Sequence, residues 1–495
     1  MLFQANQSPI KRSLDWLSTR SGITWLVVLG AALRSYHYLR GPSLWHDEAA
    51  LVVNVLEKSF RELLGPLLFS EAAPPLFLWL EKAVVMLLGD SLYALRLPPF
   101  LASCASLGLL AYVARRWLSP AAAPWAVLLF ACSDKLLGHS CEAKQYTIEA
   151  LAALVVLALY IRTENWLLER RLLLFAALAP VLMSLAYPGC FLYGGLLLAF
   201  LPSVWRSRHA SEWLSYAALA TCVFSTFALL LIGPMYAQRN QAIVECWEGM
   251  RQFPDWNRPW TVPGWLLRAS MELIAYVIRP IGPFFVPGTI IGAVVFWRRG
   301  MFAPLTLLAT PILLAGAASC FKAYPYGGVR VMVYAAPAIV LWAGAGIELC
   351  LAWFGARQRA LAWALAAVLL APLGFAARQV AFPSPRADCA SAAAFVEQHR
   401  QADEPVAANH WEYLYYFRNL GLSFSPLERF TPPTQGRVWF VATAAERADR
   451  DACLTATFPV NRWQTIDRKE FERTSVVLVQ AKRDATAGLS TGLSR

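Results

Sequence analysis

Two adjacent carboxylates, Asp47 and Glu48, follow the first apolar segment of the chain, in the sequence Gly41-Pro-Ser-Leu-Trp-His-Asp-Glu48. Acidic side chains are costly within hydrocarbon and are often functional where they occur at membrane depth. A carboxylate in this position can accept a proton as a general base, although an acidic pair just past a span is also typical of a solvated loop. Asp47 and Glu48 are therefore candidate catalytic residues.

A further acid and three cations lie in later polar segments. Glu142 and Lys144 belong to the sequence Ser140-Cys-Glu-Ala-Lys-Gln-Tyr146. Lys322 and Arg330 are the first and last residues of a later polar segment, 322–330. An acid that takes a proton, together with cations that hold a phosphate, is the minimum set for group transfer from a phosphate-linked donor. Each has a structural alternative, because Glu142 and Lys144 can form a loop salt bridge and Arg330 can extend to lipid headgroups.

The composition requires a membrane environment. Of 495 residues, 58% are hydrophobic and 15% are charged, which leaves too little polar surface for a soluble fold of this size. The net charge of +12 is spread as pairs of basic residues between apolar runs, so it predicts membrane topology and excludes a nucleic-acid-binding block. The ten cysteines show no zinc-finger spacing. Cys389 and Cys453, in the polar tail, are either a disulfide or two unpaired thiols.

Apolar runs predict an all-α polytopic membrane protein with about eleven transmembrane helices. Residues 1–21 are expected to be cytoplasmic, because Lys11, Arg12 and Arg20 precede the first run. The transmembrane domain is expected over 22–380. The predicted spans are 22–40, 96–114, 121–138, 146–161, 172–187, 189–203, 213–233, 282–297, 302–320, 331–349 and 360–377.

The first outer loop, 41–95, is expected to carry helices that lie on the membrane surface, because residues 49–70 alternate apolar and charged residues. Residues 74–89 carry Glu81 and Lys82 and are interpreted as a third such helix. If they were a full span, every later loop would change sides and the arginine pairs would face outward. Residues 234–280 are expected to form a long outer loop, whose tryptophans suit either sugar stacking or interfacial anchoring.

The tail, residues 383–495, has the pattern of a small α/β domain outside the membrane. Helices are predicted at 392–399 and 411–420, and strands at 405–408, 437–442 and 475–480. The tail contains no phosphate loop or recognisable catalytic motif. An accessory role, such as acceptor recognition, is expected for it.

The order of these motifs resembles the integral-membrane glycosyltransferases of the GT-C superfamily, and in particular the bacterial protein-mannosyltransferase and aminoarabinose-transferase-like (family 39/83-like) group. The resemblance rests on a retained first span, Trp45-His-Asp-Glu-Ala49, a Pro-Pro-Leu segment and Leu92-Tyr-Ala-Leu-Arg-Leu-Pro98. The segments Glu142–Tyr146 and Tyr326–Arg330 are also similar to that group. It covers roughly residues 20–350 and leaves the tail unassigned.

The resemblance implies an inverting transfer of a sugar from a polyprenyl-phosphate-linked donor to a lipid, glycan or protein acceptor, on the periplasmic face of a bacterial cytoplasmic membrane. It implies that Asp47 is the catalytic base, with Glu48 in support and Glu142 as an acid near the donor. The cations implied for the donor phosphate are Lys144, Arg330 and Lys322. Supporting roles fall to Glu71, Tyr146 and Tyr326.

The chain departs from the family pattern at several positions. Ala73 stands where a His often precedes the Pro-Pro segment, Cys141 stands where an Arg is common, and Lys144 replaces a usual Arg. Some relatives hold a divalent metal ion through a Glu in this region and a His in a later outer loop. Glu71 can supply the first ligand, but residues 234–280 contain no His, which leaves His46 and Glu48 as the other candidates.

Two functions of other classes fit the same composition. One is a lipid or polysaccharide transporter, or flippase, which would need charged or broken positions within its spans. The other is a non-catalytic membrane scaffold whose tail recruits partners. A transferase requires the Asp47 carboxylate, whereas a transporter or a scaffold tolerates its loss.

Overall fold

The computed structural model describes residues 19–482, so Lys11 and Arg12 lie outside the described residues. The chain forms two compact units. The first comprises the chain up to Gly41 together with Lys58–Pro383. The second comprises Pro42–Glu57 and the chain from Ser384 onward, which means that the segment carrying Asp47 folds with the tail.

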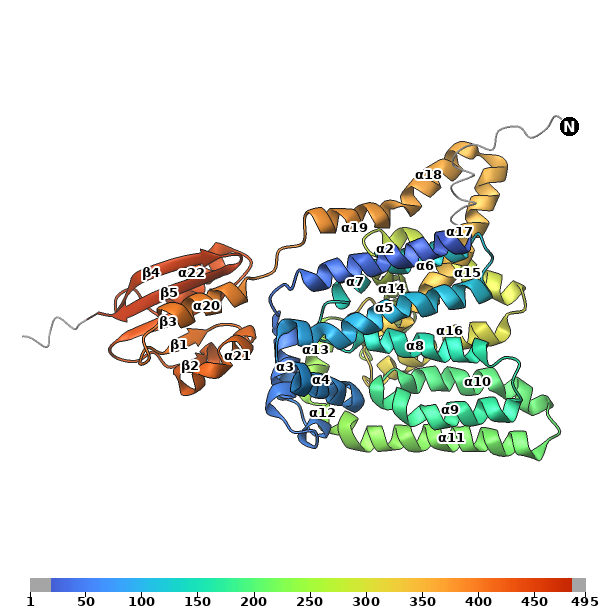
Figure 1. Cartoon of the computed structure of the whole chain (residues 1–495), viewed down its shortest axis with the longest axis horizontal. Coiled ribbons are helices and arrows are strands. Elements are labelled where there is room, and N and C mark those ends of the chain that lie inside the picture. The colour runs from blue at the N-terminus through green and yellow to red at the C-terminus, as the bar shows by residue number, and fades with distance from the viewer. Residues whose placement is uncertain (1–18, 483–495) are drawn as a thin grey trace, which may run out of the picture. The chain divides into compact units, whose positions relative to one another are not determined.

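The first unit is helical, and its early helices lie side by side in Figure 1, where α2 packs on α5, α5 on α8, and α9 on both α10 and α11. Its helices are α2 (Arg20–Leu39), α4 (Pro75–Leu88), α5 (Leu92–Trp117), α6 (Ala123–Cys132), α7 (Asp134–His139), α8 (Tyr146–Arg162), α9 (Leu168–Leu185), α10 (Gly189–Arg206), α11 (Ala210–Leu230), α12 (Tyr236–Gln238), α13 (Gln241–Gly249), α14 (Val262–Val277), α15 (Gly282–Arg298), α16 (Phe302–Cys320), α17 (Ala336–Arg357), α18 (Arg359–Leu369) and α19 (Ala371–Ala381).

The chain is a multi-pass integral membrane protein. Within residues 19–482, five helical stretches are long and apolar enough to cross a membrane: Leu92–Trp117, Gly189–Arg206, Ala210–Gln238, Phe302–Cys320 and Arg330–Phe354. The stretches Pro259–Val277 and Gly282–Arg298 make a sixth if they form one span bent by 108°.

Each of the eleven expected spans coincides with a helix or with two consecutive helices. Five of the described stretches, or six with the bent pair, are long and apolar enough to cross a membrane, so the number eleven stays a prediction. The third expected span breaks at Ser133, whose hydroxyl accepts from the amide of Leu136 and donates to the carbonyl of Val277. The eleventh breaks between α18 and α19. The segment 234–280, expected to be a long outer loop, is largely helical, because α13 and α14 occupy much of it.

Two glycines let α15 and α17 approach closely. A methyl group on Gly292 would overlap the carbonyl of Trp342, and one on Gly346 would overlap the carbonyl of Gly288. Small residues at such crossings allow helix backbones to pack in contact, which is how helices associate where lipid supplies no hydrophobic driving force.

Arg34 of α2 is fully buried. Its guanidinium donates to Ser103 Oγ of α5 at 2.7 Å and to the carbonyls of Phe130 and Ala131, near the end of α6, at 3.1 and 3.2 Å. Arg34 is therefore held inside the helix bundle and does not extend to the surface. It satisfies carbonyls that the C-terminal end of α6 leaves without helical partners.

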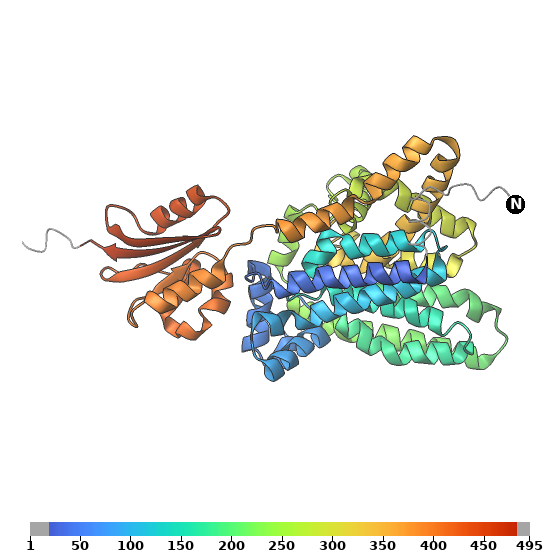
Figure 2. The ribbon, with the colours of Figure 1, turned by 45° about the horizontal axis from the view of Figure 1, so that its top comes forward.

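The second unit contains α3 (His46–Glu57) and a five-stranded mixed sheet. Its strands are β1 (Val406–Ala408), β2 (Phe424–Pro426), β3 (Arg437–Thr443), β4 (Trp463–Phe471) and β5 (Thr474–Ala481), in the order β2-β1-β3-β5-β4. Strand β1 runs parallel to β2 and β3, whereas β5 runs antiparallel to β3 and β4. Its other helices are α20 (Cys389–His399), α21 (Glu412–Tyr416) and α22 (Arg447–Thr457), and Figure 2 shows the sheet with these helices from a second angle.

The sheet separates two apolar cores, as alternation along β3 requires. Trp439 and Val441 pack with residues of α20. Val438 and Phe440 pack with Phe458, the residue that follows α22. The two predicted helices and three predicted strands of the tail are confirmed, whereas β2, β4 and α22 were not predicted. Cys389 is buried in one core and Cys453 packs against the other, and both are free thiols, which settles the alternative in favour of unpaired cysteines.

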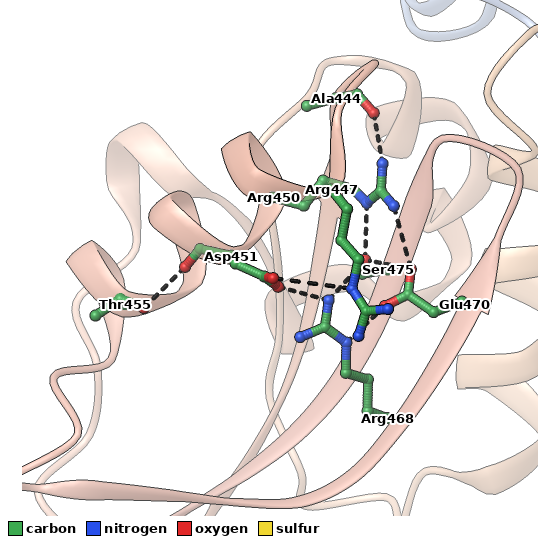
Figure 3. Close-up of polar contacts among 8 residues, drawn as sticks. All are labelled: Ala444, Arg447, Arg450, Asp451, Thr455, Arg468, Glu470 and Ser475. Atoms are coloured by element: carbon green, nitrogen blue, oxygen red, sulfur yellow. Dashed lines mark hydrogen bonds and ion pairs between the residues drawn. The ribbon is translucent and has the colours of Figure 1, made fainter.

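An ion cluster joins α22 to β4 and β5 (Figure 3). Arg450 donates to Ser475 Oγ at 2.8 Å and to Glu470 Oε2 at 3.2 Å. Arg468 donates to Glu470 Oε1 at 2.6 Å and lies 2.6 Å from Asp451 Oδ1. Burial raises the pKa of Glu470, but the hydrogen bonds from Ser475 and Arg468 outweigh it and leave the pKa below its usual value.

Arg34→Met is expected to lower the melting temperature of the detergent-solubilised protein by several degrees. The reason is that each buried acceptor left without a donor costs about 1–3 kcal/mol. The matched control is Arg116→Met, because the Arg116–Glu164 pair is about half exposed on both sides and such pairs contribute about 0–1 kcal/mol. Equal shifts for the two variants would contradict the structural role of Arg34.

Acid is expected to loosen the β4–β5 hairpin through Glu470. A folded-state pKa below the unfolded value of 4.5 means that this carboxylate stabilises the domain fully above pH 4.5 and less as the pH falls through the folded value. The protection factors of β4 and β5 amides in the full-length protein, which correct for the intrinsic pH dependence of hydrogen exchange, should therefore fall more in acid in wild type than in Glu470→Gln. Glu397→Gln, on the exposed side of α20, should behave as wild type. An identical acid response in the Glu470 variant would refute the role of this carboxylate.

Candidate functional site

The turn between α7 and α8, residues 140–145, is buried although it is polar in sequence. Glu142, Lys144, Gln145 and Tyr146 are all less than a tenth exposed. Charged groups remain buried only when they are paired. The partners of these four residues therefore define the candidate site in the first unit.

Lys144 pairs with Glu71. The ammonium nitrogen lies 2.7 Å from Glu71 Oε2, and the two side chains are 2% and 13% exposed. The same turn donates from Gln145 to the carbonyl of Ala72 at 3.3 Å. The pair joins segments 73 residues apart, whereas the sequence suggested a loop salt bridge between Glu142 and Lys144.

Glu142 belongs to a chain of three hydrogen-bonded side chains. Its Oε2 lies 2.7 Å from His139 Nδ1, and His139 Nε2 lies 2.7 Å from the hydroxyl of Tyr276 on α14. A carboxylate, an imidazole and a phenol in this order can orient the ring and carry a proton between them. The predicted acid at Glu142 is thus linked to two residues that the sequence did not suggest.

Arg330 and Tyr146 come together from two distant segments. Arg330 is half-buried at the start of a 3-10 helix, Arg330–Ala335, and its guanidinium carbon lies 6.0 Å from the centre of the Tyr146 ring. The same ring lies 5.1 Å from the imidazole of His139. Tyr146 therefore packs between a cation and the chain of side chains that begins at Glu142.

Lys322 and Tyr326 lie instead with the segment around α14. Lys322 is exposed and forms an ion pair with Glu248, at the rim of a pocket of about 720 Å³ that Trp256, Trp265 and Arg268 also line. The hydroxyl of Tyr326 shares a hydrogen bond of 2.8 Å with Ser270 Oγ. Burial raises the pKa of Tyr326 against the smaller opposite effect of that bond, so the phenol stays protonated at neutral pH. The two lysines expected to bind the donor phosphate therefore pair with different acids, Lys322 with Glu248 in this pocket and Lys144 with Glu71.

Asp47 and Glu48 lie in the first turn of α3, where the helix N-terminus favours negative charge. Both side chains are buried, at 8% and 0% exposure. Glu48 Oε2 accepts from Arg386 at 3.1 Å and from the amide of Trp45 at 3.4 Å, in the manner of a capping box. Within the second unit, Glu48 is thus held by the amide of Trp45, which precedes it, and by Arg386 from the tail.

His46 lies next to the beginning of α21. His46, His410 and Glu412 each present one potential ligand atom, and the three atoms lie within 4.8 Å of one another. The hydrogen bond to Glu412, at 3.2 Å, raises the pKa of His410 against the effect of burial. The other two residues expected with His46 have other contacts, since Glu48 pairs with Arg386 and Glu71 with Lys144.

Several residues of these clusters were missed from the sequence. His139 precedes Glu142 by three residues, a helical spacing that could have been noticed. Tyr276 was hidden because its segment was predicted to be a loop. Gln238 accepts from the amide of Ala73 and from the hydroxyl of Tyr187, and no local pattern marks it. His410 and Glu412 belong to a tail in which no motif was recognisable.

Similar proteins are found both by a sequence-family match and by a match of the fold. Residues 72–231 match the sequence model of the family described as dolichyl-phosphate-mannose-protein mannosyltransferase. ArnT from Cupriavidus metallidurans in its apo state superposes with a TM-score of 0.52 at 14% identity, over 92% of this chain and 98% of that one. The same protein bound to undecaprenyl phosphate gives 0.53 at 14% identity, over 93% and 98%. Comparison with curated protein sequences gives no significant match.

Lys144→Met is expected to destabilise the protein strongly, because it leaves the largely buried carboxylate of Glu71 without its cation. Breaking a buried pair by removing one partner costs about 3–5 kcal/mol, whereas an exposed pair contributes about 0–1 kcal/mol. The matched control is Lys322→Met, whose pair with Glu248 is 45% and 38% exposed. Thermal unfolding in detergent measures both.

The double variant Glu71→Gln/Lys144→Met should recover part of that stability, since it removes both charges together. Failure of the double variant to improve on Lys144→Met would show that the two side chains are not energetically coupled.

Proposed function

We propose that this chain is an integral-membrane glycosyltransferase of the GT-C type, which moves a sugar from a polyprenyl-phosphate donor to an acceptor hydroxyl or phosphate with inversion. The proposal rests above all on the buried acidic pair at the start of α3, in a chain with the fold of ArnT. An ArnT structure contains undecaprenyl phosphate, which is the class of lipid phosphate proposed here as the leaving group.

In the proposed reaction the acceptor oxygen attacks the anomeric carbon of the sugar from the face opposite the phosphate. Asp47 takes the acceptor proton as the new carbon–oxygen bond forms. The bond between the anomeric carbon and the phosphate oxygen breaks, and the lipid phosphate leaves with one additional negative charge. Glu48, fixed by Arg386, holds the first turn of α3 and so orients its neighbour.

Charge on the departing phosphate must be stabilised by fixed cations. Lys144 and Arg330 are assigned this role, because both are at least partly buried and each is positioned by a neighbour, Glu71 or Tyr146. Glu142, with His139 and Tyr276, is assigned to the donor side as a proton-carrying chain. Lys322 is assigned to the pocket that it lines with Trp256 and Arg268, because exposed tryptophan and arginine suit a sugar-bearing acceptor. Tyr326 is assigned a supporting role there, since its ring lies 6.2 Å from that of Trp265, another residue of the pocket lining.

The proposed topology has eleven crossings, a cytoplasmic N-terminus and a periplasmic tail from residue 383, in the cytoplasmic membrane of a bacterium. Polar contacts support the alternation, because segments predicted on one side contact each other. Pairs among the predicted inner ends are Arg116–Glu164 and Arg299–Glu348, and pairs among the outer segments are Glu71–Lys144 and His139–Tyr276.

The test is sugar transfer by proteoliposomes that contain wild type or Asp47→Asn, with a panel of radiolabelled polyprenyl-phosphate sugars and envelope extracts as acceptors. The variant is expected to bind donor while transfer falls by about 10²-fold or more, as for loss of a general base. Glu57→Gln, which changes an exposed carboxylate at the other end of α3, should transfer as wild type does.

Three outcomes decide between the functions. Equal transfer by Asp47→Asn and wild type refutes the base and makes Glu142 the next candidate. Movement of intact lipid-linked sugar across the bilayer, with no transfer to any acceptor, supports a transporter. If Asp47→Asn transfers normally and transfer is lost only when the tail is disrupted, the tail carries the function.

A further inference from the structure

Two imidazoles and one carboxylate meet within the second unit, and no step of the proposed reaction uses them. His46 begins α3, while His410 and Glu412 flank Trp411 at the beginning of α21. Their ligand atoms all lie within 4.8 Å of one another, although His46 is more than 360 positions from the other two in sequence. In the part of the chain that the structure describes, this is the one group of three such residues.

The spacing suits a shared ion. His410 Nδ1 and Glu412 Oε2 are 3.2 Å apart. Two ligands of a tetrahedral zinc ion, at bond lengths of about 2.0–2.2 Å, lie about 3.4 Å from each other. His46 is exposed, and its ligand atom lies within 4.8 Å of the other two. The rings of His46 and His410 have centres 6.2 Å apart and are inclined at 64°, so they are not stacked.

The protein holds these ligands in place by contacts that do not involve them. On either side of His46, the amide of Leu44 donates to the hydroxyl of Tyr416 at 2.8 Å, and Glu48 accepts from Arg386 at 3.1 Å. These contacts join the start of α3 to α21 and to the segment before α20. The ligand residues therefore belong to one compact unit that is organised before any ion binds, which reduces the ordering that binding requires.

Burial of the carboxylate supports a cationic occupant. The Glu412 side chain is only 5% exposed, whereas its ion-pair partner His410 is 38% exposed. A buried carboxylate is stable only when a cation or several hydrogen-bond donors compensate it. A divalent ion shared with two exposed or half-buried imidazoles supplies that charge and remains accessible from solvent.

We propose that His46, His410 and Glu412 form a binding site for a divalent transition metal of the zinc class. Two imidazole nitrogens and one carboxylate oxygen favour zinc over magnesium or calcium, which prefer oxygen ligands. Three protein ligands leave a fourth position for water or for a group of a bound molecule. This set shares only His46 with the ligands expected from the sequence, and it does not depend on the proposed transfer reaction.

A bound ion also affects the position of Asp47, because His46 immediately precedes it in sequence. Bound metal fixes the first residue of α3 to the start of α21 by coordination bonds. The orientation of the α3 N-terminus then depends on the tail through the ion as well as through Arg386. This role is structural for His46, His410 and Glu412, and none of them is assigned contact with the sugar.

The test uses the full-length protein in detergent, purified without a polyhistidine tag and stripped with a chelator. Titration with Co²⁺ reports the coordination through its visible absorption, and competition with Zn²⁺ followed by metal analysis gives the stoichiometry. Wild type is expected to take one ion per chain and to develop the intense absorption of a tetrahedral site. His399→Ala, an exposed histidine in the same unit, is the matched control and should bind as wild type.

His46→Ala and Glu412→Gln are expected to weaken binding at least about tenfold, as loss of a ligand requires. His46 is exposed, so its variant keeps the fold and isolates the effect on the metal. Zinc should also raise the melting temperature of wild type and His399→Ala but not of His46→Ala. No stoichiometric metal in wild type, or equal affinity in His46→Ala and His399→Ala, would overturn the proposal.

Discussion

The ion pair between Lys144 and Glu71 is the contact on which the arrangement of the first unit's polar residues depends. Neither charge can remain in such a buried place alone, so each requires the other. The pair fixes the turn before α8 against the segment before α4. That turn also carries Glu142 and Tyr146, and through them the positions of His139, Tyr276 and Arg330 are linked to the same contact.

The apolar pattern was sufficient to predict most helices, because a membrane constrains their length and composition strongly. Breaks within apolar segments were not predictable in the same way. Ser133 ends α6 and donates a hydrogen bond to a carbonyl on α14, and no residue near it in sequence indicates that partner. The helix α14 was missed as well, because the arginines and tryptophans spread over residues 239–268 suggested an interfacial loop.

Site residues were predictable by type but not by partner. Glu71, Glu142 and Lys144 were recognised as unusual charges, yet the sequence suggested local pairs for them. The structure joins Lys144 to a residue 73 positions away and Glu142 to an imidazole that bonds a phenol on α14. Local spacing determines which side chains share a helix face, whereas long-range pairing depends on helix packing. The Lys144 ammonium acts as a compact point charge, which suits its ion pair with Glu71.

Because the second unit combines an early and a late part of the chain, it can fold only after the first unit has been synthesised. Segment 42–57 packs with residues from Ser384 onward, so its partners are synthesised 384 − 57 = 327 residues after it. At typical synthesis rates this interval is roughly 15–65 s, during which α3 and its two acids have no tail to fold against. The acidic pair thus acquires its final surroundings as one of the last events of biogenesis. A chain interrupted before Ser384 would insert its helices and still lack the second unit.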